Sequence, residues 1–453
     1  MATYRLKQGY NVRIVGAPET TVSNAPAPSE VAINAQGFCG MKAKLAVKAG
    51  DQVKAGTPLF TEKSNDKIKF TSPVSGTVKE IARGARRALL DIVVIADGEN
   101  TYEEFEAIGA DALLTTPREK ILDEVLSAGL FPFFVERPFA VLADPEKTPR
   151  DIFVSAFNTA PLSPEINVIL EGNEAAFQAG LNALTRLTEG KVNLGIDASR
   201  SDLSSALTSA ANVEVHKFTG AHPAGNVGVQ AHHIKAVNKG ETVWTITPQG
   251  VISIGKLFLE GKYNAERIVA VAGESATEKK HFKTISGVKL STLLGDKPTK
   301  DHTVRVISGD ILSGTKMNDE SYLGFQDSLV TLIPEIQERE FMGWLVPGLN
   351  KESYSNTFLS WLTPSKKYNH NTGYHGGVRA MVQTGKYESV VPMDIYPTHL
   401  LKSIMYQDFE EMEALGIYEV APEDLALCDY VCVSKIEAQA LLREGLDAFL
   451  KEG

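Results

Sequence analysis

The spacing of hydrophobic and polar residues divides the chain into three kinds of segment. Over residues 1–100, short apolar runs alternate with turns rich in Gly, Pro and Asp, which is typical of a small all-β unit. From residue 101, apolar residues recur at helical spacing between short apolar runs. From residue 396 onward, helical spacing predominates. The pattern predicts a multi-domain protein that combines α+β and α/β units.

The most regular part of the first unit is residues 70–87, which predict strand, tight turn and strand. At the turn, Pro73 fixes one φ angle and Gly76 can adopt a positive φ. Residues 47–60 repeat this order upstream, and the apolar run at 89–96 predicts a buried closing strand. The layout predicts a barrel-sandwich, lipoyl-like domain over residues 1–100, because it resembles that of lipoyl and biotinyl carrier domains.

The resemblance to carrier domains draws attention to Lys67. Carrier domains hold their cofactor on a lysine at a hairpin tip, and Asp66-Lys67 mimics the carrier Asp-Lys pair. However, Lys67 lies only six residues before Pro73, whereas carrier domains have a longer second arm. The alternative interpretation, which we favour, is a solvated turn lysine.

Residues 101–255 predict a Rossmann-like domain with a parallel sheet. A helix is predicted over residues 118–129, with Gly129 ending it. Strands and helices then alternate, which implies helices on both faces of the sheet. The predicted strands cover residues 151–157, 166–170, 192–196 and 213–218, and the helices cover 172–187 and a segment from Ser201 through Ala211.

The loop at residues 220–228 follows the last of these strands. In open α/β sheets, ligands bind beyond the carboxyl ends of the strands, and a Gly-rich loop there can present N–H groups to a phosphate. The loop does not match the GxGxxG pattern, and a structural turn is an equally good interpretation. His232 and His233 follow without a third ligand at a metal spacing, so we interpret them as structural.

The remaining segments predict three further units. Residues 256–335 read strand, polar loop, strand, short helix and strand, which predicts a β-grasp-like (SLBB-like) domain. Residues 336–395 predict a β-rich connecting segment, with a strand at 340–346 that carries Trp344 and a mobile polar loop at 369–377. Residues 396–453 predict a helical domain in which Pro397 suits a first helical turn.

Three cysteines limit the metal chemistry of the chain. Cys428 and Cys432 are four residues apart, so they would share one face of a helix. A cubane iron–sulfur cluster needs four thiolates, and only Cys39 remains, so this chain cannot supply a complete set. We therefore expect two free thiols in a core.

Composition narrows the class of protein further. The 453 residues carry a net charge of −10, which argues against nucleic acid as a partner. No apolar run reaches the roughly 18–20 residues that span a bilayer, and the polar N-terminus predicts no signal peptide. Few cysteines indicate a reducing compartment. We expect a soluble cytoplasmic chain that could be a peripheral subunit.

Several long motifs together resemble one known family, the A subunits of the bacterial sodium-translocating NADH:quinone reductases. The motifs are GDQVKAGTPLFTEK, KFTSPVSGTVKEIARGARR, FTGAHPAGNVG, VRVISGDILSG, EREFMGWLVPG and EDLALCDYVC, and they run from the first domain to the last. The chain is also similar, more distantly, to the C subunit of the Rnf complex and to the flavin-bearing NADH-dehydrogenase subunit of complex I.

The resemblance implies a peripheral subunit on the cytoplasmic side of the bacterial inner membrane. It would dock on other subunits, especially a multi-span membrane subunit, of an enzyme that couples NADH oxidation and ubiquinone reduction to sodium export. The distant relatives hold iron–sulfur clusters on a Cys-rich helical segment and flavin phosphate on a Gly-rich loop followed by paired glutamates. Here only Cys428 and Cys432 remain, and the loop lacks the Glu-Glu pair.

These departures imply a redox scaffold that holds no flavin and no iron–sulfur cluster of its own, without a catalytic acid, base or nucleophile. The family's association with quinone places the expected ubiquinone contacts on the matching loop residues, namely Gly220, His222, Pro223 and Gly225. Two alternatives stay open. One is an acyl or biotin carrier modified on Lys67, and the other is a free-standing flavin- or NADH-dependent oxidoreductase.

Overall fold

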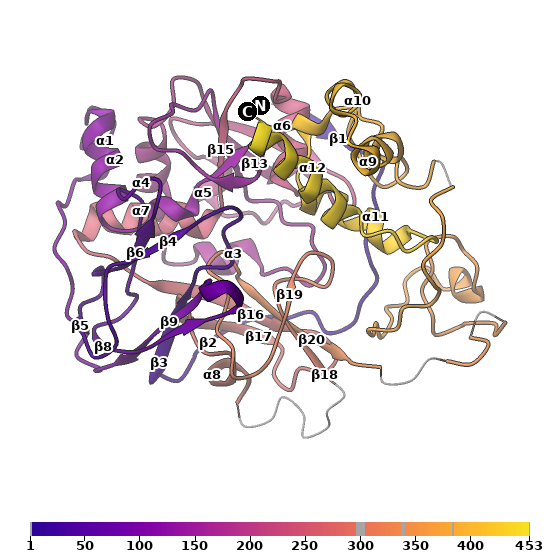
Figure 1. The fold of residues 1–453 in the computed structure, drawn as a ribbon, viewed down its shortest axis with the longest axis horizontal. Helices are drawn as coiled ribbons and strands as arrows, with labels where there is room; N and C mark the ends of the chain where they lie inside the picture. The colour runs from indigo at the N-terminus through magenta and orange to yellow at the C-terminus, as the bar shows by residue number, and fades with distance from the viewer. Residues whose placement is uncertain (1, 296–303, 337–339, 344, 383–384, 453) are drawn as a thin grey trace.

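The fold is taken from a computed structural model that describes residues 2–295, 304–336, 340–343, 345–382 and 385–452. The described strands form four sheets of seven, six, four and three strands. Figure 1 shows the chain running through them from the N-terminal β unit to the C-terminal helices. Among the described residues, none of the helices combines the length and the apolar character needed to cross a bilayer.

Two small antiparallel sheets form the N-terminal β unit. Their core includes the stacked rings of Phe60 and Phe70, whose centroids are 4.4 Å apart. Gly76 is required at the predicted turn, since a Cβ there would lie 1.8 Å from the carbonyl oxygen of Ile95. One sheet consists of β3 (Glu30–Asn34), β9 (Leu89–Ala96), β8 (Gly76–Arg83) and β5 (Gln52–Val53), with η1 (Ala85–Arg87) after β8; the other consists of β4 (Ala43–Leu45), β6 (Pro58–Glu62) and β7 (Lys69–Thr71).

The first two strands of the chain belong to other sheets. β1 (Thr3–Arg5) pairs in parallel with β14 of the seven-stranded sheet. β2 (Glu19–Asn24) pairs in parallel with β17 of the six-stranded sheet. The sequence offered no signal for this, because both strands are largely exposed and their partners lie far along the chain.

The seven-stranded sheet has a parallel centre and an antiparallel edge. Its order is β1-β14-β13-β12-β15-β10-β11. The parallel strands are β12 (Ile152–Ser155), β13 (Val192–Asp197), β14 (Glu214–Thr219) and β15 (Val243–Ile246), and the antiparallel ones are β10 (Val135–Arg137) and β11 (Val141–Leu142). The helices of this part are α1 (Ala110–Leu113), α2 (Arg118–Ser127), η2 (Phe131–Phe133), α3 (Ile166–Leu170), α4 (Glu174–Leu184), α5 (Ser205–Thr208), α6 (Val227–Lys235) and α7 (Pro248–Glu260).

Two predictions in this part need correction. The apolar run at 166–170 is the helix α3, not a strand; the side chain of Glu165 caps it by accepting a hydrogen bond from the N–H of Asn167. A mostly apolar run of five residues is compatible with either a strand or a helix. The capping hydrogen bond favours the helix. The helix expected from Ser201 through Ala211 is reduced to α5, and its cap is Ser204.

The amphipathic helix predicted at 172–187 is present as α4. It packs against α7 with the two backbones in close contact. A Cβ on Gly255 would lie 1.7 Å from the carbonyl oxygen of Ala176, and one on Gly180 would lie 2.1 Å from that of Val251. Small residues let the helices approach this closely. The pair buries Phe177, Leu181, Leu184 and Phe258.

The six-stranded sheet carries the strands predicted between residues 256 and 335. Its order is β19-β18-β20-β16-β17-β2, which mixes parallel and antiparallel pairs. The elements are β16 (Glu266–Ala272), β17 (Lys280–Ile285), α8 (Leu290–Leu294), β18 (Val304–Ser308), β19 (Thr315–Met317) and β20 (Leu329–Pro334).

In the described residues of the segment 336–395, the strand predicted at 340–346 is not found. Residues 341–343 form a turn, and Trp344 lies outside the described residues. Within the described part of this segment, the regular structure is the short helix η3 (Leu359–Leu362) and an isolated bridge from Tyr368 to Ile14. The apolar residues that suggested a strand are exposed instead of paired, with Phe341 87% exposed.

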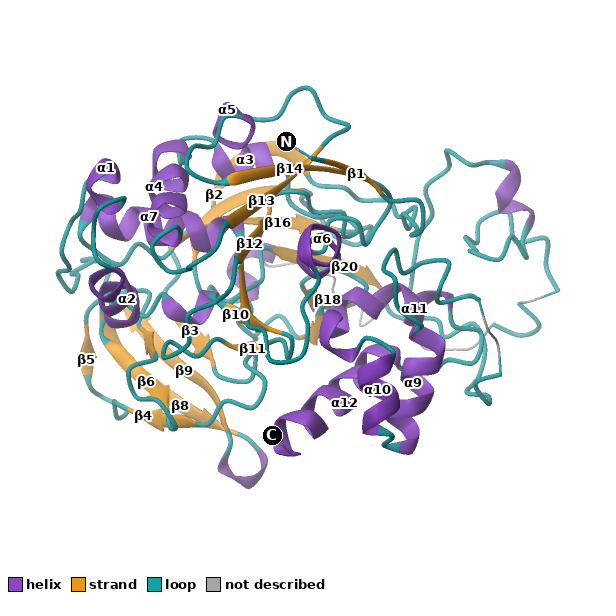
Figure 2. Ribbon diagram, turned by 90° about the horizontal axis from the view of Figure 1, so that it is seen from above, coloured by secondary structure: helices purple, strands orange, loops and turns teal. Residues whose placement is uncertain are grey.

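The C-terminal part is helical, as predicted. It consists of α9 (Pro397–Tyr406), α10 (Phe409–Ala414), η4 (Ile417–Glu419), η5 (Pro422–Leu425), α11 (Ala426–Val431) and α12 (Ala438–Glu452). Figure 2 shows α9 to α12 gathered next to one another at one side of the molecule.

Both C-terminal cysteines are buried free thiols, as expected. Burial raises the pKa of the Cys428 thiol. Cys432, however, follows the last residue of α11, so the two cysteines do not share a continuous helix face. The Cys432 sulfur accepts a hydrogen bond from the hydroxyl of Tyr387 at 2.9 Å.

Candidate functional site

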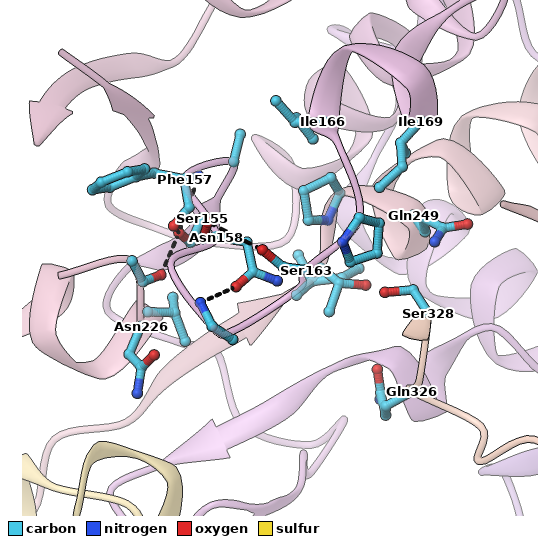
Figure 3. A pocket seen from close by; sticks show the side chains of 18 of the residues that line it. Ser155, Phe157, Asn158, Ser163, Ile166, Ile169, Asn226, Gln249, Gln326 and Ser328 are labelled. Carbon is cyan, nitrogen blue, oxygen red and sulfur yellow. Dashed lines mark hydrogen bonds between the residues drawn. The ribbon is translucent and has the colours of Figure 1, made fainter. Parts of the chain in front are cut away.

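A cavity lies at the carboxyl ends of the parallel strands. It has a volume of about 520 Å³ and is lined from three directions: by the loops after β12, β13 and β15, by residues of the six-stranded sheet, and by Glu423 of the C-terminal helices. Figure 3 shows Gln249, Gln326 and Ser328 on one side and Ser155, Phe157, Asn158 and Asn226 on the other.

The topology of the sheet explains this position. After β12 the chain adds β13 and β14 on one side, and then returns to place β15 on the other side of β12. Loops on the two sides of such a reversal diverge and leave a crevice. Polar residues at the ends of these strands, including Ser155, Asp197 and Thr247, therefore border the cavity.

Of the four predicted site residues, Gly225 lines the cavity together with its neighbours Asn226 and Val227. Gly220, His222 and Pro223 are not among its lining residues. They lie earlier in the same loop, which runs from the end of β14 to the start of α6. The sequence thus predicted the correct loop, but of the four residues predicted in it, Gly225 alone is among the lining residues of the cavity.

The backbone of the loop is tied into the protein. The N–H of His222 donates to Asn11 at 2.8 Å, and that of Gly225 donates to the hydroxyl of Thr159 at 2.9 Å. Inside the loop, Ala224 N–H donates to Ala221 O and Asn226 N–H donates to Pro223 O. These N–H groups therefore serve the loop's own structure, as the structural-turn interpretation predicts.

His222 is the least satisfied polar group of the loop. It is 4% exposed, its Nδ1 lies 3.2 Å from the Thr159 hydroxyl, and its Nε2 has no hydrogen-bond partner within the described part of the chain. Burial lowers the pKa of His222, which favours the neutral ring. Whichever tautomer is present, Nε2 is a buried donor or acceptor without a partner, which is costly unless a ligand or water satisfies it.

Gly225 provides a direct test of how the loop is held. A Cβ at this position would lie 2.0 Å from the carbonyl oxygen of Phe157. We expect Gly225→Ala to push the two loops apart and to lower the free energy of unfolding by about 1–3 kcal/mol, the range for overpacked sites. Urea denaturation measures this change.

The matched control is Gly109→Ala, since nothing lies within 4 Å of a Cβ built on Gly109. We expect it to change stability by less than about 0.5 kcal/mol, as at other open surface positions. Equal effects of the two substitutions would contradict the close packing at Gly225.

Sequence reasoning missed two cationic residues of the cavity wall. Arg200 forms ion pairs with Glu165 and Asp202 near the start of α3. Arg267 is buried, lies over the ring of Phe133 at 4.5 Å, and donates to Ser286 and to the carbonyl of Phe325. Burial lowers the pKa of Arg267 to about 10. From the sequence, Arg267 could have been noticed as an arginine within the otherwise apolar run of β16.

A buried charge cluster fastens the loop to the C-terminal helices. Arg137 on β10 donates to Asp424 at 3.1 Å and to Glu423 at 2.5 Å. Asn226 donates to the other oxygen of Asp424 at 3.1 Å. The side chains of Arg137 and Asp424 are 4% and 0% exposed. The cavity wall, the antiparallel edge of the seven-stranded sheet and the C-terminal helices are thus held together by one set of charges.

The other candidate residues have ordinary structural surroundings. His232 contacts Glu419 at 2.6 Å and accepts from the N–H of Asp394, while His233 contacts the carbonyl oxygen of Pro392. Within the described residues no cluster of three potential metal ligands is found. Lys67 is exposed between β6 and β7, as expected of a turn lysine.

Comparisons with known proteins agree with this architecture. Three family models match: the NqrA N-terminal barrel-sandwich hybrid domain over residues 4–97, the NqrA second alpha/beta domain over 116–263 and the NQRA C-terminal domain over 268–319. The predicted barrel-sandwich domain and the α/β domain are thereby confirmed.

Relatives match over the full length. The Na⁺-translocating NADH-quinone reductase A subunit of Pasteurella multocida (strain Pm70) is 40% identical over 449 residues, covering 99% of each chain. The corresponding protein of Marinomonas sp. (strain MWYL1) is 39% identical, and that of Shewanella frigidimarina (strain NCIMB 400) is 38% identical, with the same or greater coverage. The chain therefore belongs to the NqrA family, the A subunits of the Na⁺-translocating NADH-quinone reductases.

Proposed function

We propose that this chain is a peripheral subunit that docks on the membrane subunits of a sodium-pumping NADH:ubiquinone reductase, on the cytoplasmic side of the inner membrane. It would scaffold electron transfer from NADH to quinone and carry no redox group itself. The observation that supports this most is 38–40% identity to the named subunits over 99% of the chain. We interpret the seven-stranded sheet as Rossmann-like and the six-stranded sheet as β-grasp-like.

The scaffold role is supported by the contacts of the 220–228 loop and of the segment that carries Cys428 and Cys432. In the 220–228 loop, the N–H groups of His222, Ala224, Gly225 and Asn226 bond to the chain itself. Cys428 and Cys432 are packed in the hydrophobic core with Leu425 and Val431. With three cysteines in total, the chain cannot supply the four thiolates of a cubane cluster.

We further propose that the chain contacts ubiquinone at the 220–228 loop. The partnerless Nε2 of His222 could donate to a quinone carbonyl, or accept from a quinol hydroxyl, according to its tautomer. In this proposal Gly220 and Pro223 set the course of the loop around His222, and Gly225 forms the adjacent cavity wall. The cavity offers both apolar and polar walls, which suits a ring with polar substituents.

Association with the reductase is tested by affinity purification of the tagged chain from mildly solubilised membranes of its source cell. We expect the eluate to contain identified membrane-spanning companion subunits and to show sodium-stimulated reduction of ubiquinone-1 by NADH. Recovery of the chain without these subunits and without that activity would overturn the proposed function.

Quinone contact is tested with His222→Phe in the whole complex. Loss of one hydrogen bond of about 1 kcal/mol predicts a KM for ubiquinone-1 about five times higher, with a much smaller change in kcat. The control is His399→Phe, because His399 is exposed on α9. An unchanged KM in a normally folded variant would exclude His222 from the quinone site, while leaving the proposed association with the reductase intact.

A further inference from the structure

The segment between the six-stranded sheet and the C-terminal helices presents an unusual amount of apolar surface. Figures 1 and 2 show the chain between β20 and α9 projecting from the body of the molecule. We call eight exposed side chains of this projection the apolar face: Phe341, Met342, Leu345, Val346, Leu349, Leu359, Trp361 and Leu362. Exposed apolar side chains that form a contiguous patch mark interaction sites, so the arrangement of these eight residues matters.

The two stretches that carry the apolar face lie side by side. The N–H of Leu359 donates to the carbonyl oxygen of Pro347 at 2.9 Å. A Cβ on Gly348 would lie 2.2 Å from the ring of Phe358. Lys351 donates to the carbonyl oxygen of Gly343 and lies over the Phe358 ring at 5.5 Å. The eight side chains therefore belong to one continuous structure.

The base of the projection is fixed to the rest of the protein. Glu352 has a fully buried side chain that accepts from the hydroxyl of Tyr10 at 2.5 Å and from Arg13 at 2.6 Å. Its second oxygen contacts His370 at 2.9 Å and accepts from Tyr430 at 3.4 Å. A face held in place before binding loses less conformational freedom on docking, which favours affinity.

The charge around the apolar face differs from that of the whole chain. Between residues 340 and 382 there are four basic residues (Lys351, Lys366, Lys367 and Arg379) and two acidic ones (Glu340 and Glu352), whereas the chain has 46 basic and 56 acidic residues. Glu352 is buried and Glu340 pairs with Lys351. Lys367 and Arg379 are exposed in this stretch of the chain, and we call these two residues the basic border of the face.

We propose that the apolar face is the docking surface for a companion subunit of the reductase that presents an apolar patch bordered by carboxylates. This inference rests on the proposed function and adds to it the surface and the chemistry of the partner. Exposed Phe and Trp side chains with a basic border match the usual interface pattern of an apolar centre and a polar rim. The acidic border of the partner follows from charge complementarity.

A protein partner fits the observations better than a lipid surface. Recruitment to anionic lipid uses clusters of about 4–8 exposed basic residues. Here Lys351 is paired with Glu340, and Lys366 is engaged by Leu349 and Asn350. Among the described residues, Lys367 and Arg379 remain for long-range attraction, against eight exposed apolar side chains.

The test uses the tagged full-length chain expressed in a strain that lacks its own copy. Membranes are solubilised mildly, and companion subunits that copurify are identified and quantified relative to the chain. We expect the double variant Phe341→Ser/Trp361→Ser to recover at least tenfold less of them than the wild-type chain. The control Tyr406→Ser removes a side chain that is 85% exposed on α9 and should recover the wild-type amount.

A second arm tests the alternative occupant. The purified wild-type chain is sedimented with protein-free vesicles of equal parts phosphatidylcholine and phosphatidylglycerol. If the chain does not sediment with the vesicles, the result supports a protein partner. If it does, and the double variant does not, the apolar face binds lipid and the proposed protein partner is wrong. Thermal unfolding of each variant checks the fold, and a milder variant, Leu345→Ser, is used if the double variant unfolds.

The possible results separate the inference from the function on which it rests. If wild type recovers the companion subunits and the correctly folded double variant recovers them equally, the apolar face is not the docking surface, and the proposed function stands. If even wild type recovers none, the proposed function itself is overturned.

Discussion

Replacing Arg137 with methionine should lower the free energy of unfolding by about 3–5 kcal/mol, the range for removing one partner of a buried ion pair. The substitution leaves the carboxylate of Asp424, whose side chain is fully buried, without its cation. Methionine fills much of the same volume, so the loss comes from the uncompensated charge more than from a cavity. Urea denaturation at pH 7 measures the change.

The same substitution at a surface pair provides the control. Arg305 pairs with Glu335, but its side chain is 32% exposed, so Arg305→Met should cost only about 0–1 kcal/mol. Adding Asp424→Asn to Arg137→Met should restore part of the lost stability, because it removes the stranded charge. Equal costs for the two arginines would contradict the account of the cluster.

Glu352→Gln should lower the free energy of unfolding by about 3 kcal/mol at pH 7, because one pKa unit corresponds to about 1.4 kcal/mol. Burial alone would raise the pKa of Glu352, but hydrogen bonds from His370, Tyr10 and Arg13 outweigh burial and lower it to about 2, from an ordinary value of 4.5. Glutamine keeps the shape of the side chain but loses the charge that these donors stabilise.

The pH dependence has a definite sign. Because the folded pKa of Glu352 is depressed, its contribution to stability is complete above the unfolded pKa, near 4.5, and is lost as the pH falls toward about 2. The difference between wild type and variant should therefore be constant from pH 7 to 5 and shrink below pH 4.5. Glu340→Gln, at an exposed pair, is the control and should change stability by less than about 1 kcal/mol. A difference that persists unchanged below pH 4 would contradict the assignment.

The Glu352 prediction also bears on docking. Tyr10 and Arg13 come from the N-terminal stretch, His370 from the projection and Tyr430 from the C-terminal helices. A weakened anchor would leave the apolar face less ordered before it meets a partner. We therefore expect Glu352→Gln to reduce recovery of the companion subunits less than the Phe341→Ser/Trp361→Ser variant does.

Local patterns in the sequence sufficed to predict much of the fold. Apolar residues at helical spacing identified α2 and α4, the apolar run at 89–96 identified β9, and the alternation of strands with helices identified β13 and β14. Turn chemistry at Pro73 and Gly76 identified the turn between β7 and β8, although these two strands belong to different sheets instead of forming a hairpin. These signals are strong because a helix or a buried strand imposes its period on the residues that form it. The five-residue run at 166–170 was too short for the period to decide.

The residues that build the site could be found only in part. The loop at 220–228 was recognisable because a Gly- and Pro-rich stretch follows a predicted strand. That Gly225 borders the cavity while His222 does not depends on the segment after β12 and on the N-terminal stretch, through Thr159 and Asn11. Partners so distant in sequence leave no periodic pattern.

The order of residues alone was enough to establish the element types of the long periodic segments, the cysteine count that rules out a self-supplied cubane cluster, and the family through its long motifs. It took the folded chain to show that β1 and β2 join distant sheets, that Arg137 meets Asp424, and that the residues near 341 are an exposed face instead of a strand. Secondary structure follows from near neighbours, whereas pairing, burial and exposure depend on where the whole chain places each residue.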